Sequence, residues 1–324
     1  MTRSCREREV VATTPWVGRL RVLASATLAL GALTHCGQAA NGGVGDPFPS
    51  AAAAQPTSSI ASSRPLLRAG LRSSPYGNFP FPEPAWWLDS TASMASRFSG
   101  ATPAVVWIVG EMLFPADCGL SFPSPAGTYP NIQFTPVDRN EAYLNAFDQA
   151  GLRVWLQVEP GDADVPTLID LVLRRYGGHP SVVGLGIDVE WYQSGAYEEG
   201  RPVVDAEARA WSERVRSYNP DFVLFLKHWL IEKMPSSYRT GIVFVDDSQE
   251  LGSLDAMVEE FAVWGEAFAP AEVGFQVGYE ADQTWWSGLA DPPGDIGRAL
   301  LERIPNMTDL YWVDFTAYTL WPPR

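Results

Sequence analysis

The sequence predicts a single (β/α)8 barrel of the TIM type spanning residues 76–324. Short apolar runs rich in Val, Ile, Phe and Trp alternate there with segments of helical periodicity, which is typical of βα units that build a parallel sheet. Eight such runs in about 250 residues match the usual size of this barrel. A doubly wound open sheet would usually show a glycine-rich phosphate loop after its first strand, and neither that loop nor a Walker A or GxSxG sequence occurs.

Seven strands are clear, and their order along the chain sets the expected barrel. They are Ala104–Met112, Arg153–Pro160, Val182–Trp191, Phe222–Trp229, Gly241–Asp247, Val273–Tyr279 and Asp309–Thr316. The weaker run Asn131–Pro136 is expected to be the eighth strand and to fall second in order. Helices are expected at 164–176, 206–218 and 254–268; the first ends at Gly177-Gly178, a common helix stop.

The first 75 residues have a composition that cannot build a core. Arg19 and Arg21 precede the apolar run Val22 to Leu33, which is too short to span a bilayer and fits the apolar region of a signal peptide. The run ends in Leu33-Thr34-His35-Cys36, which resembles the lipobox of bacterial lipoproteins, although His35 replaces the small residue of that motif.

This resemblance implies export, with Cys36 lipidated and membrane attachment through that lipid alone. Secretion without a lipid and an ordinary apolar N-terminal helix are the alternatives. Residues 1–36 therefore form the expected signal and lipobox-like segment. Residues 37–75, rich in Ala, Ser, Gly and Pro, are expected to be a low-complexity tether.

Residues 76–324 are strongly acidic, with 15 Lys and Arg against 35 Asp and Glu. Nucleic acid is therefore not an expected partner. Cys118 is the only cysteine in this part, so the barrel must be stable without an internal disulfide. Only two histidines, His179 and His228, occur there, which argues against a histidine-rich metal site; carboxylates alone could hold Ca²⁺, but no cofactor is implied.

Polar residues end nearly every expected strand, and in such barrels the active site lies at the carboxyl ends of the strands. They are Glu111, Gln157, Glu159, Asp188, Glu190, Lys227, His228, Asp246, Asp247, Gln276, Tyr279, Glu280, Trp312 and Asp314. Burying carboxylates without partners costs several kcal/mol, so this clustering favours a functional site over accidental packing. A network of structural ion pairs is the alternative.

The run from Val182 to Tyr192 is the most informative. Side chains alternate along a strand, so Gly184, Gly186, Asp188 and Glu190 share one face, and Val183, Leu185, Ile187 and Val189 share the other. The apolar face must meet the helices, which turns both acids into the barrel mouth. About 6.6 Å separates alternate Cα atoms, so one carboxylate can raise the pKa of the other, as a general acid requires.

This D-x-E strand resembles that of the chitinase-type glycoside hydrolases, whose fourth barrel strand carries D-x-x-D-x-D-x-E. Asp188 and Glu190 match the last two acids, while Val183 and Gly186 stand where the first two would be. It is equally similar to the D-x-E strand of muramidases with a barrel fold. The resemblance implies Glu190 as general acid/base and Asp188 as its modulator.

A second catalytic carboxylate is expected at Asp246, although Asp246-Asp247-Ser248 could equally cap a helix. Lys227 could orient a carboxylate, bind an acidic sugar or form a salt bridge. Aromatic faces near strand ends could stack on sugar rings. The expected substrate-binding residues are Glu159, Trp191, Tyr192, Lys227, Asp247, Gln276, Tyr279, Trp312 and Asp314.

The sequence thus predicts an exported glycoside hydrolase that acts on a polysaccharide or glycan, without a cofactor. One alternative is a non-catalytic carbohydrate-binding barrel, in which the same acids bind sugar hydroxyls. The other is a metal-dependent hydrolase that holds its metal with Asp188, Glu190, Asp246 and Asp314.

Overall fold

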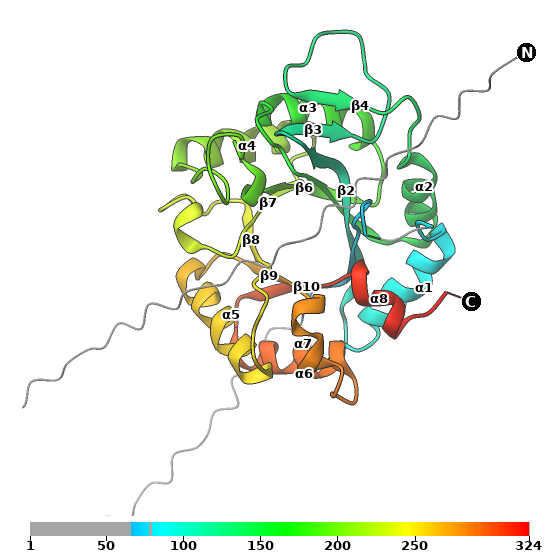
Figure 1. The fold of residues 1–324 in the computed structure, drawn as a ribbon, viewed down its shortest axis with the longest axis vertical. Coiled ribbons are helices and arrows are strands. Elements are labelled where there is room, and N and C mark those ends of the chain that lie inside the picture. The colour runs from blue at the N-terminus through cyan, green and yellow to red at the C-terminus, as the bar shows by residue number, and fades with distance from the viewer. Residues whose placement is uncertain (1–65, 78–79, 324) are drawn as a thin grey trace, which may run out of the picture. The chain divides into compact units, whose positions relative to one another are not determined.

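Eight parallel strands close into a barrel in the computed structural model, which describes residues 66–77 and 80–323 (Figure 1). In sheet order the barrel strands are β1 Arg68–Arg72, β2 Thr102–Leu113, β5 Arg153–Val158, β6 Val182–Asp188, β7 Val223–Lys227, β8 Ile242–Asp246, β9 Val273–Val277 and β10 Met307–Val313. Because β1 pairs with both β10 and β2, the sheet has no free edge between them. The predicted (β/α)8 fold is confirmed.

Helices surround the barrel (Figure 1). They are α1 Pro84–Ala95, α2 Glu141–Ala150, α3 Val165–Tyr176, α4 Asp205–Tyr218, α5 Leu254–Phe268, α6 Gln283–Trp286, α7 Pro292–Arg303 and α8 Asp314–Leu320. Three short 3₁₀ turns, η1 Val189–Trp191, η2 Ile231–Lys233 and η3 Glu280–Asp282, follow β6, β7 and β9. Within the described ranges, β7 and β8 are joined by η2 without an α-helix, and no helix is long and apolar enough to cross a membrane.

The three predicted helices form within a residue of the expected bounds, and their sequences show why. Asp164 accepts a hydrogen bond from the Thr167 backbone N–H at 3.0 Å and so caps α3. Ser253 caps α5 in the same way through the Ala256 N–H. The apolar faces of both helices pack against the outer face of the strands.

The expected boundary at residue 76 is wrong, because β1 lies inside the segment predicted to be a tether. Its inward side chains, Arg68 and Arg72, are charged and form ion pairs; Arg72 is buried and Arg68 is partly buried. The strand therefore lacks the apolar run that marked the others. The expected signal segment 1–36, with Cys36, and residues 37–65 of the expected tether lie outside the described residues.

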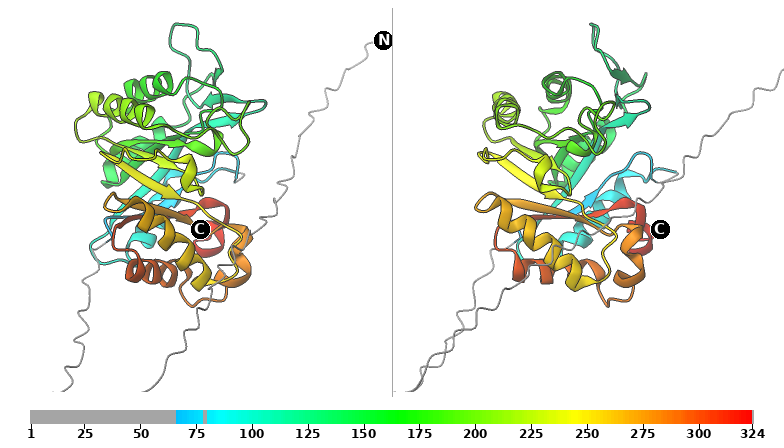
Figure 2. Two further views of the ribbon diagram at one scale, coloured as in Figure 1. Left: turned by 90° about the vertical axis from the view of Figure 1, so that its left-hand side faces the viewer. Right: turned by 60° about the vertical axis from the view of Figure 1, so that its left-hand side comes forward.

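The run Asn131–Pro136 is not the second barrel strand, and that prediction is also wrong. It contains β4 (Ile132–Phe134), which pairs with β3 (Asp117–Leu120). β3 pairs antiparallel with the end of β2, so the two short strands extend the sheet beyond the barrel. They project from the barrel at the top of both views in Figure 2.

Candidate active site

The barrel interior below the mouth is filled by side chains, so only its carboxyl end is open to chemistry. The rings of Trp155 and Phe225 meet edge to face, 5.5 Å apart between centroids. An added Cβ at Gly184 would lie 2.5 Å from Trp155, and one at Gly186 would lie 1.9 Å from Phe225. The two glycines therefore face inward, as predicted, and make room for the aromatic rings.

Near the amino end of the strands, a buried carboxylate ties the barrel together. Asp309 accepts hydrogen bonds from Arg68 Nε at 2.6 Å and from the Tyr311 hydroxyl at 2.7 Å. The guanidinium of Arg68 outweighs burial, which alone would raise the pKa of Asp309, and holds that pKa below its ordinary value. The Asp309 carboxylate is thus hydrogen-bonded by the protein's own side chains, which indicates a structural role.

β6 delivers the two predicted acids to the mouth, although they do not share a regular strand. β6 ends at Asp188, and Glu190 lies in the 3₁₀ turn η1 that follows, so the predicted strand is too long at its end. Leu185, Ile187 and Val189 face the helices as expected. Val183 does not: a register irregularity there turns it toward the interior cluster.

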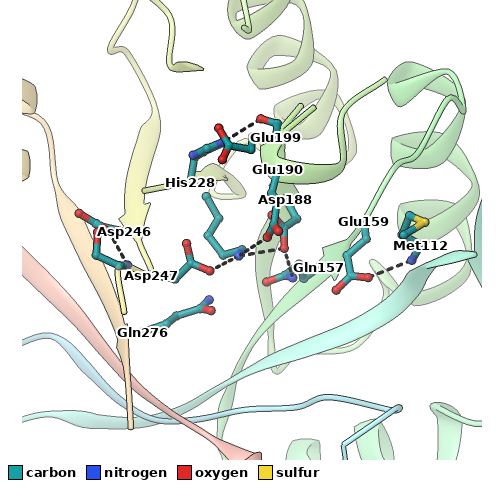
Figure 3. A network of polar contacts seen from close by, with 12 residues as sticks. Met112, Gln157, Glu159, Asp188, Glu190, Glu199, His228, Asp246, Asp247 and Gln276 are labelled. Carbon is teal, nitrogen blue, oxygen red and sulfur yellow. Dashed lines mark hydrogen bonds and ion pairs between the residues drawn. The ribbon is translucent and has the colours of Figure 1, made fainter. Parts of the chain in front are cut away.

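Lys227, the last residue of β7, joins carboxylates from the ends of β6 and β8. Its Nζ lies 3.0 Å from Asp188 Oδ2 and 4.0 Å from Glu190 Oε2, and it donates a hydrogen bond to Asp247 Oδ2. Lys227 and Asp188 are almost fully buried, whereas about a fifth of the Glu190 side chain is exposed. The structure therefore brings Asp188, Glu190, Lys227 and Asp247 together at one site (Figure 3).

Burial sets the protonation of both acids. Loss of hydration raises the pKa of Asp188 to about 7, with Lys227 acting in the opposite direction and Asp247 adding repulsion. Loss of hydration likewise raises the pKa of Glu190 well above its ordinary value, opposed by Lys227 and reinforced by the charge of Asp188. A carboxyl group that keeps its proton near neutrality, at an accessible position, can donate it to a ligand.

Asp246, the predicted second catalytic carboxylate, does not reach this network. Its Oδ1 accepts the Ser248 backbone N–H at 2.7 Å, and Figure 3 shows its side chain apart from the contacts of Asp188 and Asp247. The inner face of β8 is formed by Val243 and Val245, so the next inward residue is Asp247. Asp246 therefore stabilises a turn and caps no helix, since α5 begins at Leu254 with Ser253 as its cap. Asp247 is the β8 carboxylate at the mouth.

Glu159 lies at the mouth as predicted, held by two residues that the sequence did not reveal. Its Oε1 accepts the Tyr76 hydroxyl at 2.8 Å and lies 3.6 Å from a nitrogen of Arg72. Its Oε2 accepts the Met112 backbone N–H at 2.9 Å. Arg72 ends β1, so it was hidden when that strand was assigned to a tether. The available signal was the short run Ala69-Gly70-Leu71 directly before it.

The other predicted polar residues complete the mouth. The Tyr279 hydroxyl lies 3.4 Å from both Asp247 Oδ2 and Gln276 Oε1. Gln157 Nε2 donates to Asp188 Oδ2 at 3.3 Å. Asp314, the first residue of α8, accepts the Ser74 backbone N–H at 2.8 Å and is buried beside the end of β1.

Two of the predicted aromatic contacts are part of the core. Trp312 is fully buried between the sheet and the helices, where its Nε1 donates to Thr316. Tyr192 packs on Trp211 of α4, and its hydroxyl bonds Glu207. Neither ring can stack on a ligand at the mouth. Trp191 is half-buried in η1, beside Glu190, so its ring can still stack on a ligand.

A clamp holds the turn that carries Glu190. His228 Nε2 donates to the Glu199 carbonyl at 2.9 Å, while its Nδ1 accepts the Leu230 N–H. Burial lowers the pKa of His228 to about 4, which keeps the ring neutral for both bonds. The next residue, Gly200 at φ +73°, packs directly on the Val189 carbonyl, where an added Cβ would lie 1.9 Å from the oxygen.

Beside the mouth, a cavity of about 410 Å³ opens between the end of β2, β3 and α2. Its wall includes Phe81, Trp107, Glu111, Arg139 and Tyr143. Glu111 interacts electrostatically with Glu159, so the cavity adjoins the carboxylate network.

The four carboxylates of the metal alternative are not gathered in one place. In residues 66–77 and 80–323, no group of three or more His, Cys, Asp or Glu side chains has an arrangement that could hold a metal ion. Asp246 is the clearest departure, since its carboxylate is used by the Ser248 backbone.

Comparisons with known proteins give structural likeness without sequence likeness. No family model matches the chain, and no curated protein matches it. A candidate alpha-L-fucosidase from Bacteroides thetaiotaomicron is similar over 83% of this chain and 92% of its own, with 12% identity and a TM-score of 0.49. An endocellulase from Pyrococcus horikoshii is similar over 75% and 83%, with 12% identity and a TM-score of 0.44. For a β-glucuronidase from Bacteroides uniformis the shares are 77% of this chain but only 30% of that chain, with 13% identity and a TM-score of 0.45.

Proposed function

We propose that this protein is a glycoside hydrolase in which Glu190 is the general acid and Asp188 its modulator. One observation carries the proposal: two carboxyl groups with pKa values raised by burial stand beside a buried ammonium at the open end of a closed barrel. Cleaving a glycosidic bond needs a proton for the leaving oxygen and a carboxylate for the oxocarbenium-like centre. The mouth offers both.

In the proposed reaction, protonated Glu190 gives its proton to the glycosidic oxygen as the bond to the anomeric carbon breaks. Positive charge then develops on the sugar ring, and a carboxylate on a neighbouring strand end stabilises it. A water molecule adds its oxygen to the anomeric carbon, and the proton that it loses restores the acid. Lys227 orients the carboxylates without being consumed.

Asp247 is the best-placed group for the second carboxylate. It stands on the other side of the Lys227 ammonium from Asp188, and one of its oxygens, Oδ1, is buried without a hydrogen-bond partner. Such an atom costs free energy unless a ligand or solvent satisfies it. This role replaces the one that the sequence predicted for Asp246.

The proposal is tested by a substrate screen with a matched control. Wild type, Glu190→Gln and Glu259→Gln would be assayed for release of reducing ends from plant, fungal and bacterial polysaccharides. Glu259 is an exposed residue of α5, so its variant controls for the loss of one acidic side chain. We expect Glu190→Gln to lose about 10²- to 10⁴-fold in turnover and Glu259→Gln to match wild type.

Binding without hydrolysis by wild type would instead identify a carbohydrate-binding barrel. A substrate hydrolysed at the wild-type rate by Glu190→Gln would show that Glu190 is not the acid.

We also propose that the protein is exported and attached to a membrane through lipidated Cys36. The support is the sequence: an apolar run preceded by two arginines and ending in Leu33-Thr34-His35-Cys36. Cys36→Ser should move the protein from the membrane fraction to the soluble fraction of its host. Unchanged fractionation would contradict the lipid anchor.

A further inference from the structure

The two cations at the mouth are already neutralised by the protein's own groups. Lys227 is shared among Asp188, Asp247 and Glu190. The Arg72 terminal nitrogens are occupied by Ser74 Oγ at 2.6 Å and by the Tyr76 hydroxyl at 3.0 Å, and they face Glu159. Arg72 Nε has no hydrogen-bond partner, and the charge of the guanidinium is balanced by Glu159.

The buried polar atoms without a partner at the mouth are mostly acceptors. They are Asp188 Oδ1, Asp247 Oδ1 and Gln157 Oε1, from β6, the end of β8 and β5. Two donors, Gln276 Nε2 and Arg72 Nε, also lack a partner. Figure 3 shows Asp188 beside Gln157, and Asp247 beside Gln276.

The amide of Gln157 has a defined orientation, which fixes its oxygen as the free atom. Its Nε2 donates to Asp188 Oδ2, and a carboxylate oxygen accepts hydrogen bonds. The Tyr279 hydroxyl is shared between Asp247 Oδ2 and Gln276 Oε1, and Gln276 Nε2 has no partner.

A ligand that reaches these atoms must therefore bring mainly hydrogen-bond donors. Sugar hydroxyls do so, and an ammonium group brings three donors together with a positive charge. Glu190 keeps its proton, and Asp188 loses its own near its pKa of about 7. A ligand ammonium would therefore meet the carboxylate of Asp247 and, above about pH 7, that of Asp188, so a positive charge is favoured there. A sugar carboxylate brings acceptors only, and it adds a like charge to a buried site.

We propose that the sugar unit bound at this network is an amino sugar with a free ammonium group, held by Asp188 and Asp247. Neutral sugars bind there more weakly, and uronic acids are rejected. The inference rests on the proposed function, since it names the substrate class of the same site.

Three trisaccharides that differ only in substituents test it: β-1,4-linked trimers of glucosamine, glucose and glucuronic acid. Their affinities would be measured by isothermal titration calorimetry with wild type, Asp247→Asn, Asp188→Asn and the control Glu259→Gln. We expect the glucosamine trimer to bind wild type about tenfold more tightly than the glucose trimer, and the glucuronic acid trimer to bind least. Either Asn variant should remove most of that preference, while Glu259→Gln should keep it.

The two Asn variants serve as alternatives, so one that fails to fold leaves the other to decide. Equal or tighter binding of the glucuronic acid trimer would overturn the inference and leave the glycosidase proposal standing. An ammonium preference that survives in a folded Asn variant would also overturn it, since the ligand would then bind elsewhere on this acidic surface. Binding of none of the three trimers would overturn the inference, whereas the glycosidase proposal would still be decided by the polysaccharide screen.

Discussion

Lys227 Nζ lies 3.0 Å from Asp188 Oδ2, and the two residues are register partners at the ends of neighbouring strands β7 and β6. Both side chains are almost fully buried. The ion pair offsets part of the cost of burying the carboxylate, yet the pKa of Asp188 is still raised to about 7. The mouth therefore holds an acid that titrates in the range where most enzymes work.

This pKa predicts how stability depends on pH. Folded Asp188 binds its proton more tightly than the unfolded chain does, so the free energy of unfolding should fall as pH rises from about 4 to about 7. A pKa raised from 3.8 to about 7 corresponds to about 4 kcal/mol at most. Asp188→Asn should show a smaller fall across this window in urea denaturation, with Glu259→Gln as control. Parallel pH profiles for Asp188→Asn and wild type would contradict the raised pKa.

Alanine variants of two glycines can distinguish backbone strain alone from strain that also moves η1, the turn that carries Glu190. Gly200 and Gly100 have φ values of +73° and +81°, but an added Cβ meets the Val189 carbonyl at Gly200 and open space at Gly100. Both alanine variants should lose about 1 kcal/mol of stability from backbone strain. Only Gly200→Ala should also shift Glu190, with turnover falling about 10²-fold.

The measurements are thermal unfolding and kcat on a substrate found in the screen. Equal turnover in Gly200→Ala and Gly100→Ala would show that the clamp does not position Glu190.

β1 decides where the folded unit begins. A chain that starts at Tyr76 would lack β1, leaving β2 and β10 without their shared neighbour and Asp309 without Arg68. We expect that chain to be insoluble or to lack a cooperative thermal transition by circular dichroism. A chain that starts at Arg64 should unfold cooperatively. Equal melting curves for the two chains would mean that β1 is dispensable.

Most of the barrel could be predicted because its strands are buried on both faces and show up as apolar runs. β1 could not, since two of its five residues are arginines, which pair with Glu159 and Asp309 far along the chain. The run around Ile132 was wrongly predicted to be a barrel strand for the opposite reason, since its composition is typical of a strand. Only pairing decides whether a strand joins the barrel.

The site was predictable wherever one face of a strand differs from the other. Gly184 and Gly186 marked the inner face of β6, so Asp188 could be placed at the mouth. Both faces of β8 are apolar, so the sequence could not tell whether Asp246 or Asp247 points inward. The turn at Glu190 and the core position of Trp312 depend on packing against loops and helices, which periodicity does not reveal.

The role of Glu190 is tested most directly by the dependence of rate on the leaving group. Glu190→Gln and wild type would be compared on two aryl glycosides of the same sugar, one with a phenol and one with a dinitrophenol leaving group. Dinitrophenolate departs without a proton, whereas phenolate needs one from the acid. The account predicts that Glu190→Gln loses about 10²- to 10⁴-fold on the phenyl glycoside and far less on the dinitrophenyl glycoside. An equal loss on both substrates, or no loss on either, would contradict it.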